Sequence, residues 1–455
     1  MTIGIERTIR SCWCRWIARA ICAVRLSMSI ASATDFPIPV VADSGTGSPQ
    51  WESPNALTGG QSVVRYDSPF FQPPSLHLAA TTTNQFQVGT ALDNISSTST
   101  GSLSSMINTL GTQTVAEQRQ SLQQLGGEMF GNTQTLGLQV GDQFQQRLTN
   151  RLVSNGSFLA GDSVTQVNLS WVRGQSPTSS SAPWVQGYVA GSSVRSDGNA
   201  GAMSYNQGGA LYGWDIASDE AGVFGVTGGN SYVGFNDGSG GGQLTSYQVG
   251  LYALKHNEYA YALGSANYGY DVFGTNRNVD VGGINQTLRG SFDGHQFGSY
   301  LESGLKLEAR WIHVQPLVGL QYLYLAQQGF GESGGSAALN VAARQADSLR
   351  ASLGGRIVVH RLTGPWGAVW TPYWQGRLVS ELLDNDRIVN ASFNGSPIGG
   401  TFTSHGNQIG RNYGIFGKGL QVQLNDQWSL FGNYDAFFGG RITTSTFAAG
   451  AVYNW

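Results

Sequence analysis

Two short stretches of the chain have the residue types of a serine nucleophile. Residues 331–335 read Gly-Glu-Ser-Gly-Gly and fit the G-x-S-x-G pattern, and residues 161–163 have the Gly-Asp-Ser order of some esterase serines. A G-x-S-x-G serine needs a strand before it and a helix after it, so that a sharp turn exposes the hydroxyl. Residues 331–335 instead fall between two predicted strands, and residues 161–163 lack a matching Asp and His downstream. We therefore expect no catalytic site and no enzyme.

Other common chemistries also find no support in the sequence. The six histidines are scattered, and no two of them have the spacing of a zinc site on a helix. The Gly-rich residues 237–243 lack the lysine of a phosphate loop and read as a flexible turn. The net charge of −3 comes from dispersed residues, which argues against nucleic-acid binding. The expectation is no metal, no cofactor and no nucleic acid.

A more informative set of charges falls on the polar face of alternating segments. The set is Arg350, Arg356, Arg377 and Asp435. If the apolar face of these segments contacts lipid, the four side chains point into a hydrated interior. There they could pair with one another, or contact a helix in the interior and set the charge of a pore. Lys418 is the exception, because the same alternation puts it on the apolar face; either it snorkels to an interface or the register differs there.

The elements that carry these charges alternate with period two from about residue 184 onward. We count about twelve such segments, beginning near residues 184, 204, 221, 243, 258, 288, 310, 346, 367, 409, 427 and 444. Period two over nine or more residues is typical of transmembrane β-strands. A soluble β-sandwich also alternates, but its strands are usually five or six residues long. Tyr and Trp near the strand ends, with Gly, Ser and Gln on the second face, favour a membrane barrel.

Composition supports this interpretation. Only 12% of the 455 residues are charged, Gly contributes 64 residues and aromatics 11%. Beyond the N-terminus, no stretch approaches the roughly 18 apolar residues of a transmembrane helix. A chain that crosses the membrane without such a helix must close its strands into a barrel, so that every backbone group is paired. The predicted fold is an all-β transmembrane antiparallel β-barrel of about twelve strands.

The N-terminal part divides into three segments. Residues 1–33 carry a basic leader, all three cysteines and the small-x-small sequence Ala31-Ser32-Ala33, and predict a signal peptide. Residues 34–81 are rich in Pro, Ser and Gly and predict an irregular segment. Residues 82–153 predict helices, the clearest at 133–152. Its stripe of apolar residues recurs every four positions and consists of Leu136, Val140, Phe144, Leu148 and Leu152. Residues 154–183 are the expected connector and 184–455 the barrel.

These segments together resemble the translocator unit of type V secretion autotransporters, over about residues 82–455. The resemblance is carried by TTTNQFQVGTALD (81–93), LQQLGGEMF (122–130), QFQQRLTNRL (143–152), PWVQGYVAGSSVRSDGN (183–199), YNQGGALYGWD (205–215), residues 314–341, DSLRASLGGRI (347–357), residues 373–406 and WSLFGNYDAFFGG (428–440). It implies a barrel with its last N-terminal helix inside the pore. The implied location is the outer membrane, with the N-terminal segment exported to or displayed at the cell surface.

The resemblance also implies partners and an assembly signal. The partners would be outer-membrane lipid, the inner-membrane export machinery and the outer-membrane barrel assembly machinery, with the protein a monomer. The C-terminal strand resembles the signal read by that assembly machinery, with Phe447, Tyr453 and Trp455 as its aromatic residues. Two departures stand out. Only residues 34–81 remain for a passenger, and Asn150 stands alone where some members have an asparagine pair for self-cleavage, so no self-cleavage is expected.

The short passenger leaves a second hypothesis open. The same barrel could act as a porin-like outer-membrane channel with a plug helix. A surface enzyme that uses the extracellular loops and a soluble adhesive β-protein are further alternatives.

Overall fold

The computed structural model describes residues 75–154, 182–219, 221–309, 311–359, 362–383 and 386–454. The predicted signal peptide, most of the irregular segment, most of the connector and Trp455 lie outside these ranges. None of the helices in the described ranges combines the length and the apolar character needed to span a membrane.

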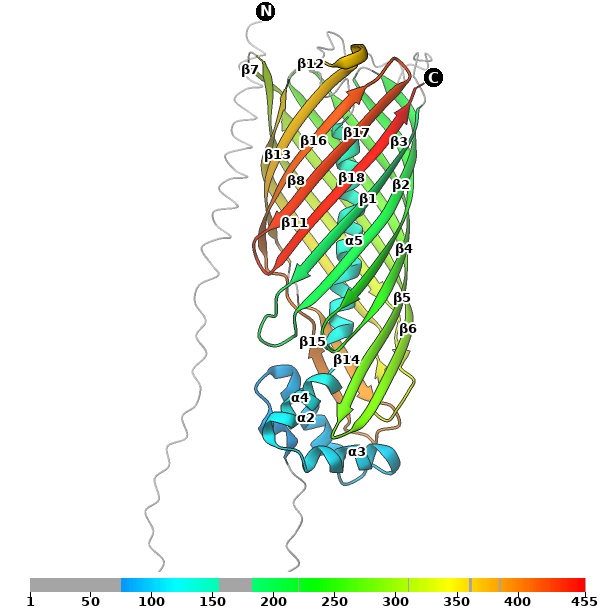
Figure 1. The fold of residues 1–455 in the computed structure, drawn as a ribbon, viewed down its shortest axis with the longest axis vertical. Coiled ribbons are helices and arrows are strands. Elements are labelled where there is room, and N and C mark those ends of the chain that lie inside the picture. Colours follow the sequence, from blue (N-terminus) through cyan, green and yellow to red (C-terminus); the bar gives the residue numbers. More distant parts are fainter. Residues whose placement is uncertain are drawn as a thin grey trace, which may run out of the picture. The chain divides into compact units, whose positions relative to one another are not determined.

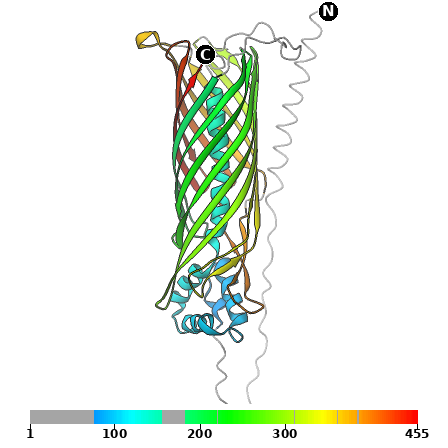
Figure 2. The same cartoon turned by 90° about the vertical axis from the view of Figure 1, so that its right-hand side faces the viewer.

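Twelve long antiparallel strands of the described chain close into one barrel (Figures 1 and 2). They are β1 (Ala182–Val194), β2 (Met203–Asp219), β3 (Gly222–Asn236), β4 (Gly240–His256), β5 (Ala260–Val281), β6 (Ile284–Leu305), β8 (Ile312–Gln327), β11 (Arg344–Val359), β13 (Val369–Glu381), β16 (Asn412–Gln423), β17 (Trp428–Phe438) and β18 (Ile442–Tyr453). Each strand pairs with the next, and β18 pairs with β1, so the sheet has no free edge. The predicted fold class is confirmed, and every predicted strand start lies within four residues of the observed one.

Alternation along each strand separates a polar lumen from an apolar outer wall. On β18, Thr444, Thr446 and Ala448 are buried on the lumen side, whereas Phe447 is 55% exposed on the outside. The outer wall carries most of the large apolar side chains that the barrel exposes, such as Val249, Leu301 and Leu378. An apolar exterior around a polar interior is what a barrel in lipid requires.

The two ends of the barrel differ. At one end, short turns join β2 to β3, β4 to β5 and β16 to β17; we call this the short-turn end. At the other, the long-loop end, residues 328–343 and 382–411 connect barrel strands. These two loops contain a small second sheet of β9 (Phe330–Gly331), β10 (Leu339–Val341), β14 (Ile388–Phe393) and β15 (Thr401–His405). The short elements β7 (Leu307–Ala309), β12 (Leu362–Thr363) and η2 (Pro365–Gly367) lie at the short-turn end.

Residues 75–127 form a compact helical unit at the long-loop end, which we call the cap (Figure 1). It comprises η1 (Leu76–Ala79), α2 (Thr83–Ile95), α3 (Gly101–Gly111) and α4 (Val115–Leu125). Thr114 and Glu117 form a capping box at the start of α4, with each side chain bonded to the other's backbone N–H. The cap begins inside the segment predicted to be irregular, since η1 starts at Leu76.

One hydrophobic core joins the cap to the long loops and to the first turns of the helix that follows. The cap contributes Leu92, Met106 and Leu122 among others, and the loops contribute Leu339, Val389 and Phe402. The cap is therefore held by the same kind of apolar packing that stabilises a domain interior, rather than by surface contacts alone.

The last helix, α5 (Glu128–Val153), runs through the lumen from the long-loop end to the short-turn end (Figures 1 and 2). It begins after Gly126-Gly127, which separates it from α4. The preceding helix, α4, ends at Leu125. Two glycines, a poor combination for a helix interior, explain the break.

The entry of α5 depends on a close backbone approach. A Cβ atom on Gly131 would lie 2.5 Å from the backbone N and Cα of Gly406, which follows β15. Only glycine at this position lets the first turns of α5 pass directly beneath the long loop.

Candidate functional site

The lumen and its helix form the candidate functional site. Of the 26 residues of α5, all but Gln146 are buried by the barrel and the cap. The predicted apolar stripe is divided along the helix: Leu136 and Val140 pack in the core at the long-loop end. Phe144, Leu148 and Leu152 pack in a second cluster with Trp184, Tyr188 and Leu211 of the barrel wall.

The rest of the helix surface is polar, and its charges find partners on the wall. Arg147 Nη2 lies 2.6 Å from Asp435 Oδ2 on β17, and both side chains are at most 1% exposed. Asn150 Nδ2 donates to the same carboxylate oxygen at 2.8 Å. Gln375 on β13 donates to the second oxygen, Asp435 Oδ1, at 3.0 Å. Asp435 therefore fixes the helix at two positions one turn apart.

A second anchor lies nearer the short-turn end. Arg151 forms an ion pair with Asp215 on β2. Tyr252 on β4 donates to the other oxygen of Asp215 at 2.5 Å, and Trp184 Nε1 donates to the tyrosine oxygen at 2.7 Å. The guanidinium also lies 5.1 Å from the centroid of the Trp184 ring, a cation–π contact that adds to the pairing.

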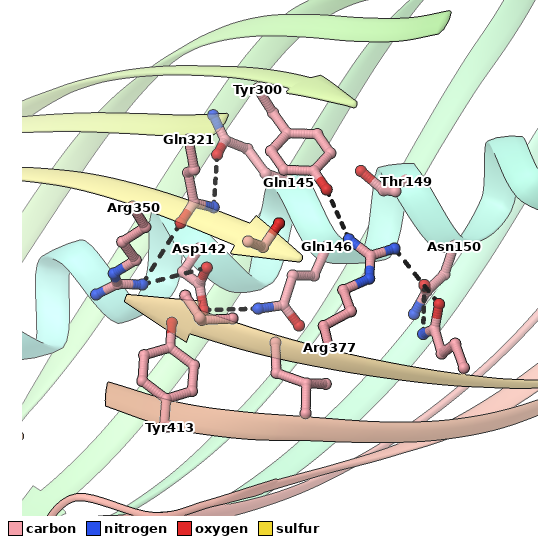
Figure 3. Close-up of a pocket in the computed structure, with 14 residues that line it drawn as sticks. Asp142, Gln145, Gln146, Thr149, Asn150, Tyr300, Gln321, Arg350, Arg377 and Tyr413 are labelled. Carbon is pink, nitrogen blue, oxygen red and sulfur yellow. Dashed lines mark hydrogen bonds and ion pairs between the residues drawn. The ribbon is translucent and has the colours of Figure 1, made fainter. Parts of the chain in front are cut away.

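A third anchor joins the middle of α5 to β11 of the barrel wall (Figure 3). Arg350 on β11 reaches Asp142 Oδ1 on the helix through Nη1 at 3.3 Å. Its Nε lies 3.2 Å from Glu381 Oε2 on β13. One arginine thus bridges a carboxylate on the helix and one on the wall, which explains how a full positive charge is kept in the interior.

Arg356 and Arg377 are paired within the wall itself. Both reach Glu302 on β6, at 3.5 Å from Arg356 Nη2 and 2.8 Å from Arg377 Nη1. Arg377 also donates to the hydroxyl of Tyr300 at 2.6 Å. Of the four charges that the sequence singled out, Arg350 and Asp435 thus contact α5, while Arg356 and Arg377 form a cluster around Glu302.

The space between helix and wall is small. The cavity in Figure 3 holds about 40 Å³ between α5 and the strands that carry Arg350, Arg377 and Tyr413. A single water needs roughly 10–15 Å³ on this measure, so the cavity has room for a few waters at most.

A fourth polar joint lies at the long-loop end, outside the barrel strands. Glu128 is buried between the cap and the loop that joins β1 to β2. It accepts hydrogen bonds from Asn84 of α2 at 3.3 Å, from Gln123 of α4, and from the backbone N–H of Gly201 at 3.2 Å. No basic side chain pairs with it among the described residues, and burial raises the pKa of Glu128 from 4.5 to about 7. Burial also raises the pKa of nearby Asp237.

The C-terminal strand closes the barrel and carries two of the three aromatic residues predicted to form an assembly signal. Phe447 projects from the outer wall, and the rings of Tyr453 and Trp428 lie 4.9 Å apart at the short-turn end. Trp455, the third, lies outside the described residues. Eleven residue pairs join β18 to β1.

Sequence reasoning missed several members of this site. The sequence did not single out the helix charges Asp142, Arg147 and Arg151, the wall carboxylates Asp215 and Glu302, or Glu128. The polar face opposite the apolar stripe was the available signal for the helix charges. Ion-pair partners more than 60 residues apart give no local signal in the chain.

A closed barrel with an apolar outer wall, a polar lumen and one helix in that lumen defines the class: an outer-membrane β-barrel. The sequence profile named Autotransporter beta-domain matches residues 183–435. The chain belongs to this family and is an outer-membrane translocator barrel.

Solved structures give matches of low sequence identity. The translocator domain of autotransporter NalP from Neisseria meningitidis is 15% identical, with a TM-score of 0.49 over 63% of this chain and 92% of that chain. The beta domain of the Bordetella autotransporter BrkA is 18% identical, with a TM-score of 0.43 over 61% and 100%. The transport unit of AIDA-I from Escherichia coli is 14% identical, with a TM-score of 0.40 over 67% and 98%. A search of curated proteins returned no matching sequence.

Proposed function

We propose that the barrel exports the part of its own chain that precedes α5, and that the cap folds outside the cell while α5 stays in the lumen as a plug. One observation carries the proposal: α5 runs from the long-loop end to the short-turn end. Outer-membrane barrels have short periplasmic turns and longer extracellular loops. In that orientation the cap and everything before it lie outside, and the connector to β1 lies in the periplasm.

The proposed role is transport, without catalysis. Ser333 of the G-x-S-x-G stretch supports this, because its backbone pairs with Arg289 of β6 in an isolated bridge, and β10 rather than a helix follows it. The neighbouring Glu332 is paired with Arg277 across the loop. The burial of nearly all of α5 likewise favours a plugged translocator over an open porin-like channel.

The partners of this role are part of the proposal. The inner-membrane export machinery would deliver the chain through residues 1–33, and the barrel assembly machinery would read β18 with Phe447, Tyr453 and Trp455. A monomer is sufficient, because one chain supplies the barrel, the plug and the cap.

Surface accessibility tests the orientation. An epitope is placed between Gly45 and Gly47, and a second between Thr112 and Gln113 in the turn from α3 to α4. Antibody added to intact cells is expected to reach both. A matched control epitope in the β16–β17 turn, next to Asp426, is expected to be reached only after the outer membrane is permeabilised. The opposite pattern would reject export of the N-terminal part.

A further inference from the structure

A positive charge lies in the middle of the apolar outer wall. Lys418 of β16 is exposed and shares its row with Trp374 of β13, Tyr434 of β17 and Phe447 of β18. Its Nζ lies 5.9 Å from the centroid of the Tyr434 ring. Within the described ranges, no carboxylate forms an ion pair with it. The register that the sequence indicated for Lys418 is therefore the observed one, and the charge faces lipid.

The depth of Lys418 in the wall favours the leaflet at the long-loop end. Toward that end, Gly414 lies four positions from Lys418, and its row also holds the exposed apolar side chains of Leu378 and Phe438. The exposed Leu424 lies six positions from Lys418 at the short-turn end. With a rise of ~3.3 Å per residue and a tilt of ~45°, these spans are about 9 Å and about 14 Å along the membrane normal. The long lysine side chain can snorkel across much of the shorter span.

An apolar hollow of about 420 Å³ lies beside Lys418 on the outer wall. Apart from Lys418 itself, the outward-facing side chains around it are aromatic or aliphatic: Trp374, Leu420, Val422, Leu430, Tyr434 and Phe447. Gly432 opens the hollow, since a Cβ there would meet nothing nearer than the Ala448 carbonyl oxygen at 3.6 Å. Leu420, Val422 and Leu430 lie on the short-turn side of Lys418, so the hollow extends from the cation toward the bilayer centre.

A second hollow, of about 850 Å³, adjoins the first. Tyr434 and Phe447 form part of both hollows. The second one extends over β18, β1, β2 and β3. Most of its lining is apolar and includes the exposed Val189 and Tyr232, but it also carries the polar side chains of Ser204, Asn206, Asn236 and Ser445. The wall thus offers an apolar slot, a cation and, in the second hollow, several polar side chains within a largely apolar surface.

We propose that this surface binds a phosphorylated lipid of the extracellular leaflet. An acyl chain lies in the apolar hollow, a phosphate pairs with Lys418, and the polar headgroup contacts the second hollow. Charge complementarity identifies the occupant, because an unpaired lysine on the lipid face costs about 2–4 kcal/mol near the midplane unless an anion or water reaches it. The assignment to the extracellular leaflet rests on the orientation proposed above, whereas the existence of the binding site does not.

Lipid binding by the full-chain protein tests the proposal. The detergent-purified protein is titrated with lipid A, and bound lipid is counted by native mass spectrometry. Lys418→Leu is expected to weaken binding about tenfold, as loss of one charge-assisted contact implies. Lys418→Arg is expected to retain lipid A binding.

Lys255→Leu, which removes an exposed lysine at the short-turn end of β4, is the matched control and is expected to bind lipid A as the parent does. Gly432→Leu keeps the charge but fills the hollow, and is expected to weaken binding.

Three outcomes would overturn the proposal. Lys418→Leu could bind lipid A as tightly as the parent. Phosphatidylglycerol could bind with the same affinity and the same dependence on Lys418, which would remove the leaflet assignment. Excess inorganic phosphate could displace lipid A completely, which would indicate a simple phosphate site. None of these readouts depends on the epitope experiment, so failure of this site and failure of the export orientation are distinguishable.

Discussion

Arg147 of α5 and Asp435 of β17 form an ion pair of 2.6 Å in which neither side chain reaches solvent. Removing one partner of such a pair leaves a buried charge alone, which costs about 3–5 kcal/mol. Replacing both with apolar residues of similar size is often neutral by comparison.

We therefore expect Asp435→Leu to lower the unfolding temperature of the barrel clearly, and Arg147→Met with Asp435→Leu to recover most of the loss. The temperature at which the folded band disappears on a semi-native gel measures this. Asp426→Asn, in the exposed β16–β17 turn, is the control and is expected to change nothing. Equal losses in the single and the double variant would mean that the pair does not act as a unit.

Docking of the cap should depend on pH through Glu128. Its pKa rises from 4.5 to about 7 when buried, so the docked state holds a proton that the undocked state releases. Docking is therefore most stable below about pH 4.5 and weakens as the pH rises toward 7, by roughly 3 kcal/mol at most. Above pH 7 the contribution of Glu128 no longer changes.

Trypsin cleavage at Arg119, followed from pH 5 to 8, reports cap opening. Glu128→Gln is expected to protect the cap at pH 8 and to flatten the profile. Burial also raises the pKa of Asp237, so its titration changes the stability of docking in the same direction. The pH profile of the double variant Glu128→Gln with Asp237→Asn should therefore be flatter than that of Glu128→Gln alone. The His405–Asp386 pair, Arg119, and Asp197 of the β1–β2 loop also carry charge near this joint. A cap that opens at low pH instead would contradict the assignment to Glu128.

The contact of Gly131 with Gly406 predicts a strong effect of a single methyl group. Gly131→Ala would place a Cβ 2.5 Å from backbone atoms, so α5 or the long loop must shift. Overpacking of this kind costs about 1–3 kcal/mol. Hydrogen exchange in the loop around Gly406 should increase. Gly187→Ala on β1, where a Cβ meets nothing within 4 Å, is the matched control. Unchanged exchange in Gly131→Ala would show that the loop is not clamped there.

Removing the plug should open the pore. A chain without residues 34–153 is expected to conduct ions in a planar bilayer, because the polar lumen then holds only the wall side chains. A chain that lacks only residues 75–127 keeps α5 and is expected to stay closed. Conductance in the second variant would assign the seal to the cap rather than to the helix.

The barrel could be predicted from sequence because period two repeats along every long strand. The same alternation suffices to put Arg350 and Asp435 on the polar face. It does not reveal that Asp435 pairs with a residue 288 positions earlier in the chain, because that depends on how α5 is rotated in the lumen. Docking of the cap was not predictable for a similar reason. Its helices have ordinary apolar faces, and the loops that cover them, such as the one around Leu339 and Val389, are distant in sequence.

The core shared by the cap and the long loops has a consequence for the direction of export. Inside the lumen, residues 75–127 cannot pack against Leu339, Val389 or Phe402, because those side chains lie beyond the long-loop end of the barrel. In the proposed route, this packing becomes available only after the segment has emerged. Its free energy then opposes backward sliding, so the cap acts as a ratchet, and no nucleotide is needed on the outer face of the membrane to hold the chain there.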